Sequence, residues 1–196
     1  MADTVESDTI LKAIDGSLAA IGMLKGQISA LARAQDMVVD CLKKGGKILT
    51  AGNGGSAAEA LHMAEELVGR FRGNRRSLPA LSLAADPTAL TCIGNDYGFD
   101  EIFRRQVEGL GQAGDVLVLF STSGRAPNLA AALDAAAARG LTTVGLLGRD
   151  GGALAGRADR ELIVPGDATE RIQEAHQVVL HIVLDAVERA FPPESA

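Results

Sequence analysis

The chain of 196 residues has no tryptophan, and aromatic residues make up only 3% of it. Its core therefore cannot depend on large rings, and the abundance of alanine and glycine favours close contact between helices and a sheet. Hydrophobic residues still make up 47%, which is ordinary for a globular protein. Because this length suffices for one domain with a full core, we expect a single domain over residues 1–196.

Cysteine and positive charge are also scarce. The two cysteines, Cys41 and Cys92, are too far apart in the sequence for a metal-binding pair or a disulfide framework, and they fit a reducing compartment. The formal net charge of −6 lacks the basic surplus with which nucleic-acid binders neutralise phosphates. The N-terminus has no signal-peptide pattern, and no window approaches about 18 uninterrupted apolar residues. We therefore expect a cytoplasmic protein without nucleic-acid or membrane partners.

The densest basic stretch of the chain contains four arginines, Arg70, Arg72, Arg75 and Arg76. We interpret this stretch as a solvated loop that follows a helix. The alternative interpretation is an electrostatic attraction for anionic substrates, since clustered positive charge raises their local concentration.

Two helical patterns open the chain, after a tail at residues 1–7 that we expect to be loose. Apolar residues recur at helical spacing from Asp8, and a second helix is predicted from about Gly26 to Lys44. Two helices are more than a minimal α/β sheet needs. Their surplus apolar surface either covers the sheet of the same chain or contacts another subunit.

From Lys47 onward, short apolar strands alternate with helices. Near-continuous apolar strands between helices indicate a parallel sheet covered on both faces, which is a three-layer αβα sandwich. The five predicted strands are Lys47–Ala51, Ala80–Ala84, Asp115–Phe120, Thr142–Leu147 and Glu161–Val164. One predicted helix follows the first loop and ends near Arg70. The other predicted helices span Pro87–Asn95, Gly98–Leu110, Pro127–Arg139 and Thr169–Ala190. A turn is predicted at Gly94-Asn95-Asp96, between two of these helices.

Two loops of small and hydroxyl-bearing residues follow the first and third predicted strands: Gly52–Ser56 and Ser121–Gly124. Ligands of such sheets bind at the carboxyl ends of the strands, and a helix N-terminus with free N–H groups suits an anion. The first loop alone fits equally well a plain turn in which Ser56 caps the helix. Three neighbouring hydroxyls in the second loop exceed the needs of one cap. The two loops together therefore favour a site for a single phosphate.

All three histidines lie on two predicted helices. His62 and Glu66 are one turn apart on the helix after the first loop, whereas Gln173, His176 and His181 share the last helix. Taken singly, each histidine is interpreted more simply as a core or surface residue than as a ligand. The pair of His62 and Glu66 is interpreted more simply as an i,i+4 hydrogen bond. Pooled, two imidazoles and two oxygen donors suit a divalent metal such as zinc, and a carboxylate beside an imidazole suits proton transfer. The pooled set is His62, Glu66, Gln173 and His181.

The segments AGNGGSAAEALHMAEEL, TCIGNDYGF, GDVLVLFSTSG and RIQEAHQVVLHIV together resemble the SIS (sugar isomerase) domain family. Within that family the HxxxE and QxxHxxxxH patterns are similar to those of the phosphoheptose isomerases. The resemblance implies a flavodoxin-like five-stranded parallel sheet. It also implies isomerisation of D-sedoheptulose 7-phosphate to D-glycero-D-manno-heptose 7-phosphate, the first step of nucleotide-activated heptose biosynthesis, as for lipopolysaccharide.

The same resemblance implies one zinc ion per subunit and a homotetramer with active sites at subunit contacts. In such an assembly, we expect the helical residues 8–44 to serve in oligomerisation. It implies that Glu66 and His181 are the catalytic acid/base pair. It assigns the zinc ligands to His62, Glu66, Gln173 and His181. The implied sugar-phosphate contacts are Asn53, Gly54, Gly55, Ser56, Glu66, Asn95, Asp96, Ser121, Thr122, Ser123 and Gln173.

The chain departs from the family at Ala126, where members often have a serine, and at Glu170, where some have an aspartate. Two alternatives to this enzyme stay open. One is a non-catalytic SIS protein that binds the replication initiator or senses sugar phosphates, although such proteins tend to lack the acid/base residues that this chain keeps. The other is an isomerase of a different sugar phosphate.

Overall fold

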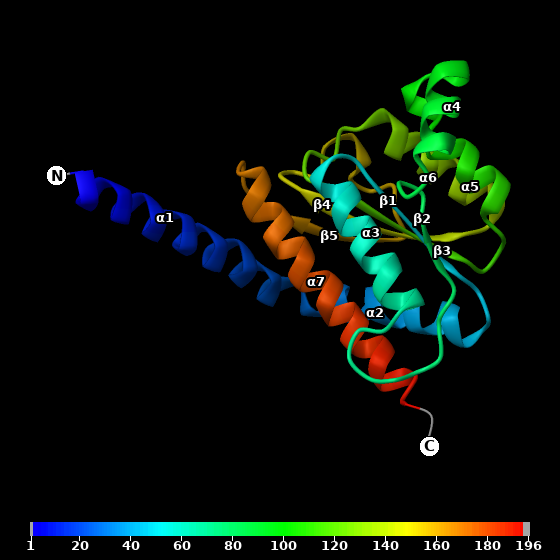
Figure 1. The fold of residues 1–196 in the computed structure, drawn as a ribbon, viewed down its shortest axis with the longest axis horizontal. Coiled ribbons are helices and arrows are strands. Elements are labelled where there is room, and N and C mark those ends of the chain that lie inside the picture. The colour runs from blue at the N-terminus through cyan, green and yellow to red at the C-terminus, as the bar shows by residue number, and fades with distance from the viewer. Residues whose placement is uncertain (1, 194–196) are drawn as a thin grey trace.

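The computed structural model describes residues 2–193 and is built around one five-stranded sheet (Figure 1). All neighbouring strands pair in parallel, in the order β2-β1-β3-β4-β5, which confirms the predicted sheet. The central neighbours β1 and β3 end together, with Gly52 opposite Phe120. The strands are β1 (Ile48–Gly52), β2 (Ala80–Ser82), β3 (Val116–Ser121), β4 (Thr142–Gly148) and β5 (Arg160–Val164).

Helices cover both faces of the sheet, because successive side chains of each strand point to opposite sides. Val116, Val118 and Phe120 of β3 pack in a core cluster with α2, α3 and α7, whereas Leu117 and Leu119 pack in a second cluster with α5 and α6. The predicted three-layer sandwich is therefore confirmed. The helices are α2 (Ile28–Lys43), α3 (Gly55–Val68), α5 (Arg104–Leu110), α6 (Pro127–Arg139) and α7 (Thr169–Ala190).

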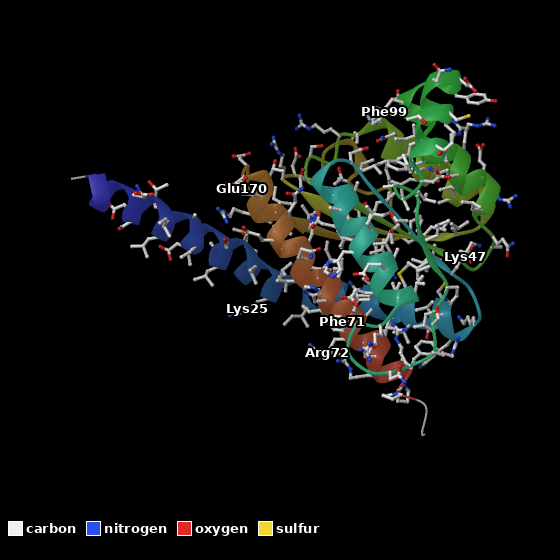
Figure 2. The ribbon with its side chains drawn as sticks, in the orientation of Figure 1. Lys25, Lys47, Phe71, Arg72, Phe99 and Glu170 are labelled. Atoms are coloured by element: carbon white, nitrogen blue, oxygen red, sulfur yellow. The ribbon has the colours of Figure 1, made fainter. Side chains whose placement is uncertain are left out.

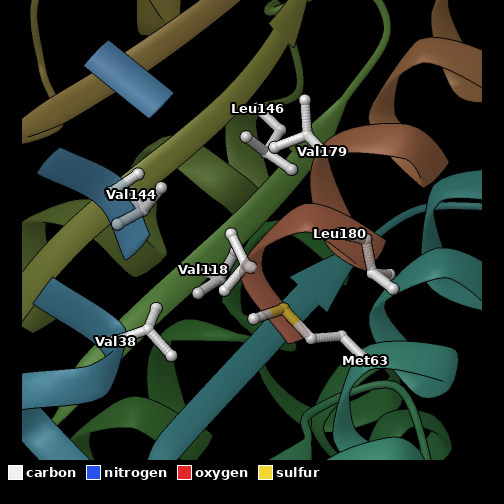
Figure 3. Close-up of a pocket in the computed structure, with 9 residues that line it drawn as sticks. Val38, Met63, Val118, Val144, Leu146, Val179 and Leu180 are labelled. Atoms are coloured by element: carbon white, nitrogen blue, oxygen red, sulfur yellow. The ribbon is translucent and has the colours of Figure 1, made fainter. Parts of the chain in front are cut away.

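A small cavity lies inside the first of these clusters (Figure 3). Only apolar side chains line it, among them Val38, Met63, Val118 and Leu180. Its volume of about 10 Å³ is close to the minimum that one water needs, and it offers no polar partner. We regard it as a packing gap rather than a ligand site.

The N-terminal segment is helical, and the loose tail expected at residues 1–7 is wrong for the part that the structure describes. Helix α1 (Ala2–Met23) begins at Ala2, while Met1 lies outside the described residues. No glycine or proline interrupts the helix before Gly16, so nothing local stops it from extending toward the N-terminus. The beginning of α1 extends away from the sheet, and its end packs against α7, where Arg171 donates to the Ser17 hydroxyl at 2.7 Å (Figure 1).

A short 3₁₀ turn (Leu24–Gln27) joins α1 to α2 and covers the edge of the sheet. The side-chain amide of Gln27 donates to the carbonyl of Ile163 at 2.7 Å and accepts from its N–H at 3.0 Å. These two bonds occupy backbone groups that the edge strand β5 would otherwise present to a foreign strand.

The predicted turn at Gly94-Asn95-Asp96 is wrong. Helix α4 (Pro87–Tyr97) starts where the Asp86 carboxylate accepts from two backbone N–H groups, and it runs through these three residues. The break falls at Gly98, whose φ of +92° an L side chain rarely adopts. A 3₁₀ turn (Phe99–Glu101) follows, and another lies at Gly152–Leu154. Over residues 2–193, no helix combines the length and the hydropathy that crossing a lipid bilayer requires.

Candidate active site

An open cleft of about 180 Å³ lies where β1 and β3 end side by side. Both predicted loops contribute to it, because adjacent parallel strands deliver their following loops to the same edge of the sheet. The polar atoms of the cleft come from an amide and four hydroxyl-bearing side chains. The lining residues are Asn53, Ser56, Phe120, Ser121, Thr122, Ser123, Ala126 and Leu129.

In the first loop, Ser56 is not the cap of the following helix. Gly54 occupies the N-cap position of α3 and no side chain bonds to the helix end, so the plain-turn interpretation with a serine cap is wrong. Ser56 instead lies in the first turn, 3% exposed, and lines the cleft. The first backbone N–H groups of the helix, with the positive end of its dipole, are thus combined with a hydroxyl group at the same place.

In the second loop, two hydroxyl oxygens already accept backbone hydrogen bonds. Ser121 Oγ accepts from the N–H of Gly124 at 3.1 Å, and Ser123 Oγ accepts from the N–H of Arg125 at 3.2 Å. Each hydroxyl keeps its own proton as a donor. The loop therefore presents donors that the backbone has already oriented, which is the arrangement that an anion requires.

Asn53 and Asn128 join the first loop to the start of α6. Their side-chain amides exchange two hydrogen bonds of 2.9 Å, and Asn128 is 1% exposed. The amide of Asn53 is therefore partly committed to a structural partner, with one N–H and one lone pair remaining. The sequence contained no signal for Asn128 beyond its position beside Pro127.

Helices α3 and α7 meet within one chain, which the sequence could not show. The imidazole rings of His62 and His181 lie 5.3 Å apart, edge to face, and Nε2 of His62 is 3.3 Å from Oε1 of Glu66. Burial, with a smaller contribution from His62, lowers the pKa of His181. A carboxylate and two imidazoles are thus assembled at one place, and their convergence needs no second subunit.

Gln173 on α7 lies beside the first turn of α3. Its amide lies so close to Gly55 that a Cβ there would stand 2.3 Å from Nε2 of Gln173. A side chain at position 55 would therefore require the Gln173 amide to move. Farther along α7, the amide nitrogen of Gln177 lies 2.9 Å from Nδ1 of His62. Sequence reasoning placed Gln177 on the last helix but assigned it no role.

Oxygen and nitrogen ligands gather on α3 in a set that differs from the predicted one. His62, Glu65 and Glu66 bring one ligand atom each within 4.8 Å of one another. Glu65 is exposed and was not among the predicted ligands. The predicted set instead takes Gln173 and His181 from α7, and both residues border the same α3 face through the contacts described above.

Three residues of the matched motifs lie outside this site. Asn95 and Asp96 contact each other at 2.8 Å, are exposed on α4, and do not line the cleft. His176 is a core residue: it is fully buried, with Nε2 at 3.3 Å from the carbonyl of Leu147. Burial lowers the pKa of His176 to about 4, so it is neutral near pH 7.

Sequence and structure comparisons agree with this geometry. The family model described as "SIS domain" matches residues 15–148. The phosphoheptose isomerase of Pelobacter propionicus is 56% identical over 79% of this chain and 82% of that protein, and the one of Geobacter sulfurreducens is 51% identical over 93% of each. The solved phosphoheptose isomerase of Francisella tularensis superposes with a TM-score of 0.90 at 35% identity, over 94% of this chain and 98% of the other.

A parallel sheet with a hydroxyl-lined cleft at the carboxyl ends of its strands places the chain among the α/β proteins whose ligand site lies at this edge of the sheet. The chain belongs to the SIS domain family and, within it, to the phosphoheptose isomerases.

Proposed function

We propose that this chain is an aldose–ketose isomerase that converts D-sedoheptulose 7-phosphate to D-glycero-D-manno-heptose 7-phosphate and so supplies nucleotide-activated heptose biosynthesis. The observation that carries the proposal is the juxtaposition of two groups of residues. The cleft with oriented donors lies at the first turn of α3, and the carboxylate–imidazole cluster lies farther along the same helix. A relative named for this activity matches 93% of the chain. The first group suits the phosphate end of the substrate and the second suits its reacting end.

The phosphate is bound by neutral donors. Ser56, Ser121 and Ser123 offer hydroxyl groups, and the N-terminus of α3 offers backbone N–H groups. Ala126 lines the same cleft at the position where the family resemblance implies a serine, so this chain lacks that donor. Because the phosphate is remote from the reacting carbons, its binding energy serves to orient them.

Proton transfer falls to Glu66 and His181. Glu66 removes a proton from C1 of the open-chain ketose, and the electron pair forms the C1–C2 double bond of an ene-diol as O2 takes up a proton. His181 carries protons between O1 and O2. The proton held by Glu66 then returns to C2, O1 loses its proton, and the aldehyde forms at C1. Each of the two groups ends in its starting protonation state.

The donor set also fits a zinc ion held by His62, Glu66, Gln173 and His181. One orphaned atom supports the fit: Oε1 of Gln177 is buried and has no hydrogen-bond partner among residues 2–193. With its amide turned over, this oxygen would accept a hydrogen bond from the Nδ1–H of His62 and leave Nε2 of that ring free as a ligand. A bound zinc ion supplies stabilisation of negative charge on the substrate oxygens. As a ligand Glu66 is a weaker base, so its two roles compete.

The proposed enzyme is a homotetramer in the cytoplasm. Helix α1 exposes a run of large apolar side chains that its own chain leaves uncovered, and a second copy is the partner that the family suggests. Both cysteines are free thiols, which fits a reducing compartment.

The direct test is incubation of the purified protein with sedoheptulose 7-phosphate, with and without a chelator, while aldoheptose 7-phosphate is measured. The Glu66→Gln variant should stay folded and bind substrate, yet turn over at least ~100-fold more slowly, because a general base typically contributes ~10²–10⁴ in rate. Glu108→Gln, which removes an exposed carboxylate of α5, is the matched control and should keep its turnover. Near-normal turnover by the Glu66 variant would contradict the assignment, and absence of product in both conditions would contradict the activity.

A further inference from the structure

The segment between α3 and β2, residues 69–79, follows a helix without regular secondary structure, as predicted, and Arg70, Arg72 and Arg76 are exposed, but Arg75 is not. We call it the α3–β2 loop. It lies across the C-terminal half of α7, where Figure 2 shows Phe71 and Arg72 beside that helix. The side chain of Arg75 is only 1% exposed. A guanidinium this deeply buried is stable only if its donors are satisfied, so the interpretation as a solvated stretch is wrong for Arg75.

Arg75 anchors the loop to both helices of the candidate site. Its Nε donates to Oε1 of Glu188 on α7 at 2.9 Å. Its Nη2 donates to the carbonyl of Glu66 at 2.7 Å, and its Nη1 donates to that of Leu67 at 3.0 Å, both at the end of α3. The other oxygen of Glu188 accepts from the N–H of Gly73 at 2.8 Å. One guanidinium thus ties the end of the helix that carries Glu66 to the helix that carries His181.

Phe71 brings the loop into contact with the imidazole of His181. The two rings stack, with centroids 5.7 Å apart and planes 18° from parallel. His62 approaches the same imidazole edge-on, with planes at 77°, so His181 has ring neighbours in two orientations. Arg72 lies 4.8 Å from the centre of the Phe71 ring and pairs with Asp185, one helical turn after His181.

We propose that the α3–β2 loop fixes the orientation of His181, with Phe71 as the contact and the Arg75–Glu188 ion pair as the anchor. The inference rests on the proposed function, in which His181 moves protons between the substrate oxygens. Phe71 is proposed to act through the imidazole of His181 and is therefore a positioning residue. Removal of its ring leaves the imidazole free to turn on one side. Substrate binding then persists while proton transfer suffers, because a misplacement of about 1 Å can cost ~100-fold in rate.

The kinetic test compares two variants of Phe71. Phe71→Leu should lower kcat at least ~10-fold and leave KM within about twofold, the split expected for an interaction that matters only in the transition state. Phe71→Tyr keeps the ring and should restore kcat to within about twofold of the unaltered protein. A general loss of packing would not be rescued by the ring in this way.

Phe191→Leu is the matched control. Phe191 is also partly buried, follows the end of α7 and lies under the guanidinium of Arg76 at 5.1 Å, yet it does not contact His181. Its loss removes a similar ring from the same end of the molecule and should leave kcat unchanged. An equal fall of kcat in the Phe191 and Phe71 variants would overturn the proposal.

A second measurement reports on ring orientation without catalysis. The chain has only three histidines, so three sets of imidazole proton signals are expected by NMR, and His181→Gln assigns the relevant one. The nuclear Overhauser contact between His62 and His181 should weaken in Phe71→Leu and persist in Phe71→Tyr. An unchanged contact, or a rise in KM at constant kcat, would overturn the positioning role. If the unaltered protein does not isomerise the substrate, the proposed function fails while this contact still tests the loop.

Discussion

Gln177 shows how one residue prepares the candidate site for a metal. Its amide nitrogen faces Nδ1 of His62 at 2.9 Å, and its carbonyl oxygen is buried without a partner in the described part of the chain. Partners of this kind fix the ring of a ligating histidine, and their loss typically weakens metal binding by about 10–100-fold. We expect Gln177→Leu to lower the zinc affinity by that factor, measured by competition with a chromophoric chelator.

The control for this prediction distinguishes two ligand sets. If zinc is held by the set that includes Gln173 and His181, Glu65→Gln should leave its affinity unchanged. If Glu65→Gln weakens binding as much as Gln177→Leu, the ion is held by the cluster on α3 alone, and the predicted set is wrong.

Glu59 makes the stability of the fold depend on pH. It lies on α3 between Ser56 and His62 and is 5% exposed, and only the Ser56 hydroxyl acts against the effect of burial on its carboxylate. Burial raises the pKa of Glu59 from 4.5 to about 7. Between these values the folded protein holds a proton that the unfolded chain releases, so this contribution to stability is present below pH 4.5 and is lost as the pH rises through 7.

The corresponding experiment measures unfolding by denaturant at pH 5 and pH 8. Glu59→Gln cannot ionise, so relative to the unaltered protein it should gain up to ~3 kcal/mol in the free energy of unfolding between the two pH values. The lowered pKa of His176 reduces the free energy of unfolding as the pH falls. Because both proteins contain His176, this effect cancels in the comparison between them. Equal pH dependence of the two proteins would show that Glu59 is already ionised or solvated in the folded state.

At the scale of helices and strands, the sequence predicts the bounds of a segment correctly where local signals mark both of its ends. The bounds of α6 were predicted correctly, because Pro127 stands at its first turn and Gly140 follows its last residue. The α4 break was misplaced because three turn-forming residues, Gly94-Asn95-Asp96, stood close to Gly98, and only the backbone shows which position needs a positive φ.

The residues of the candidate site also differ in whether a local sequence pattern reveals them. Its two loops and the His62–Glu66 spacing could be found from the sequence, since each is contained within a few consecutive residues. Asn128, Gln177 and Arg75 could not, because their partners lie 75, 115 and 113 positions away. The roles of such residues depend on how α3, α6 and α7 pack, which no local pattern encodes.

At the scale of the whole molecule, the exposed apolar face of α1 requires an explanation. Ile10, Leu11, Ile14 and Leu18 are each between 51% and 64% exposed, and monomeric proteins rarely present such a contiguous run. Asn95 and Asp96 raise a related point, since they do not line the cleft of their own chain. If they contact the sugar phosphate as the family resemblance implies, they do so from α4 of a neighbouring copy.

Both observations converge on one experiment with Leu18→Glu. A buried, unpaired carboxylate in a subunit contact is unfavourable, so the variant should elute at a lower mass than the expected tetramer, which has about four times the 20.2 kDa of the chain. Light scattering coupled to gel filtration gives the mass directly. Turnover should fall with the loss of the assembly if a neighbouring copy completes the site. Lys12→Glu changes the charge of the same helix at an exposed position without removing apolar surface, and it should stay tetrameric. A Leu18→Glu protein that keeps the tetrameric mass would show that this face of α1 serves another purpose.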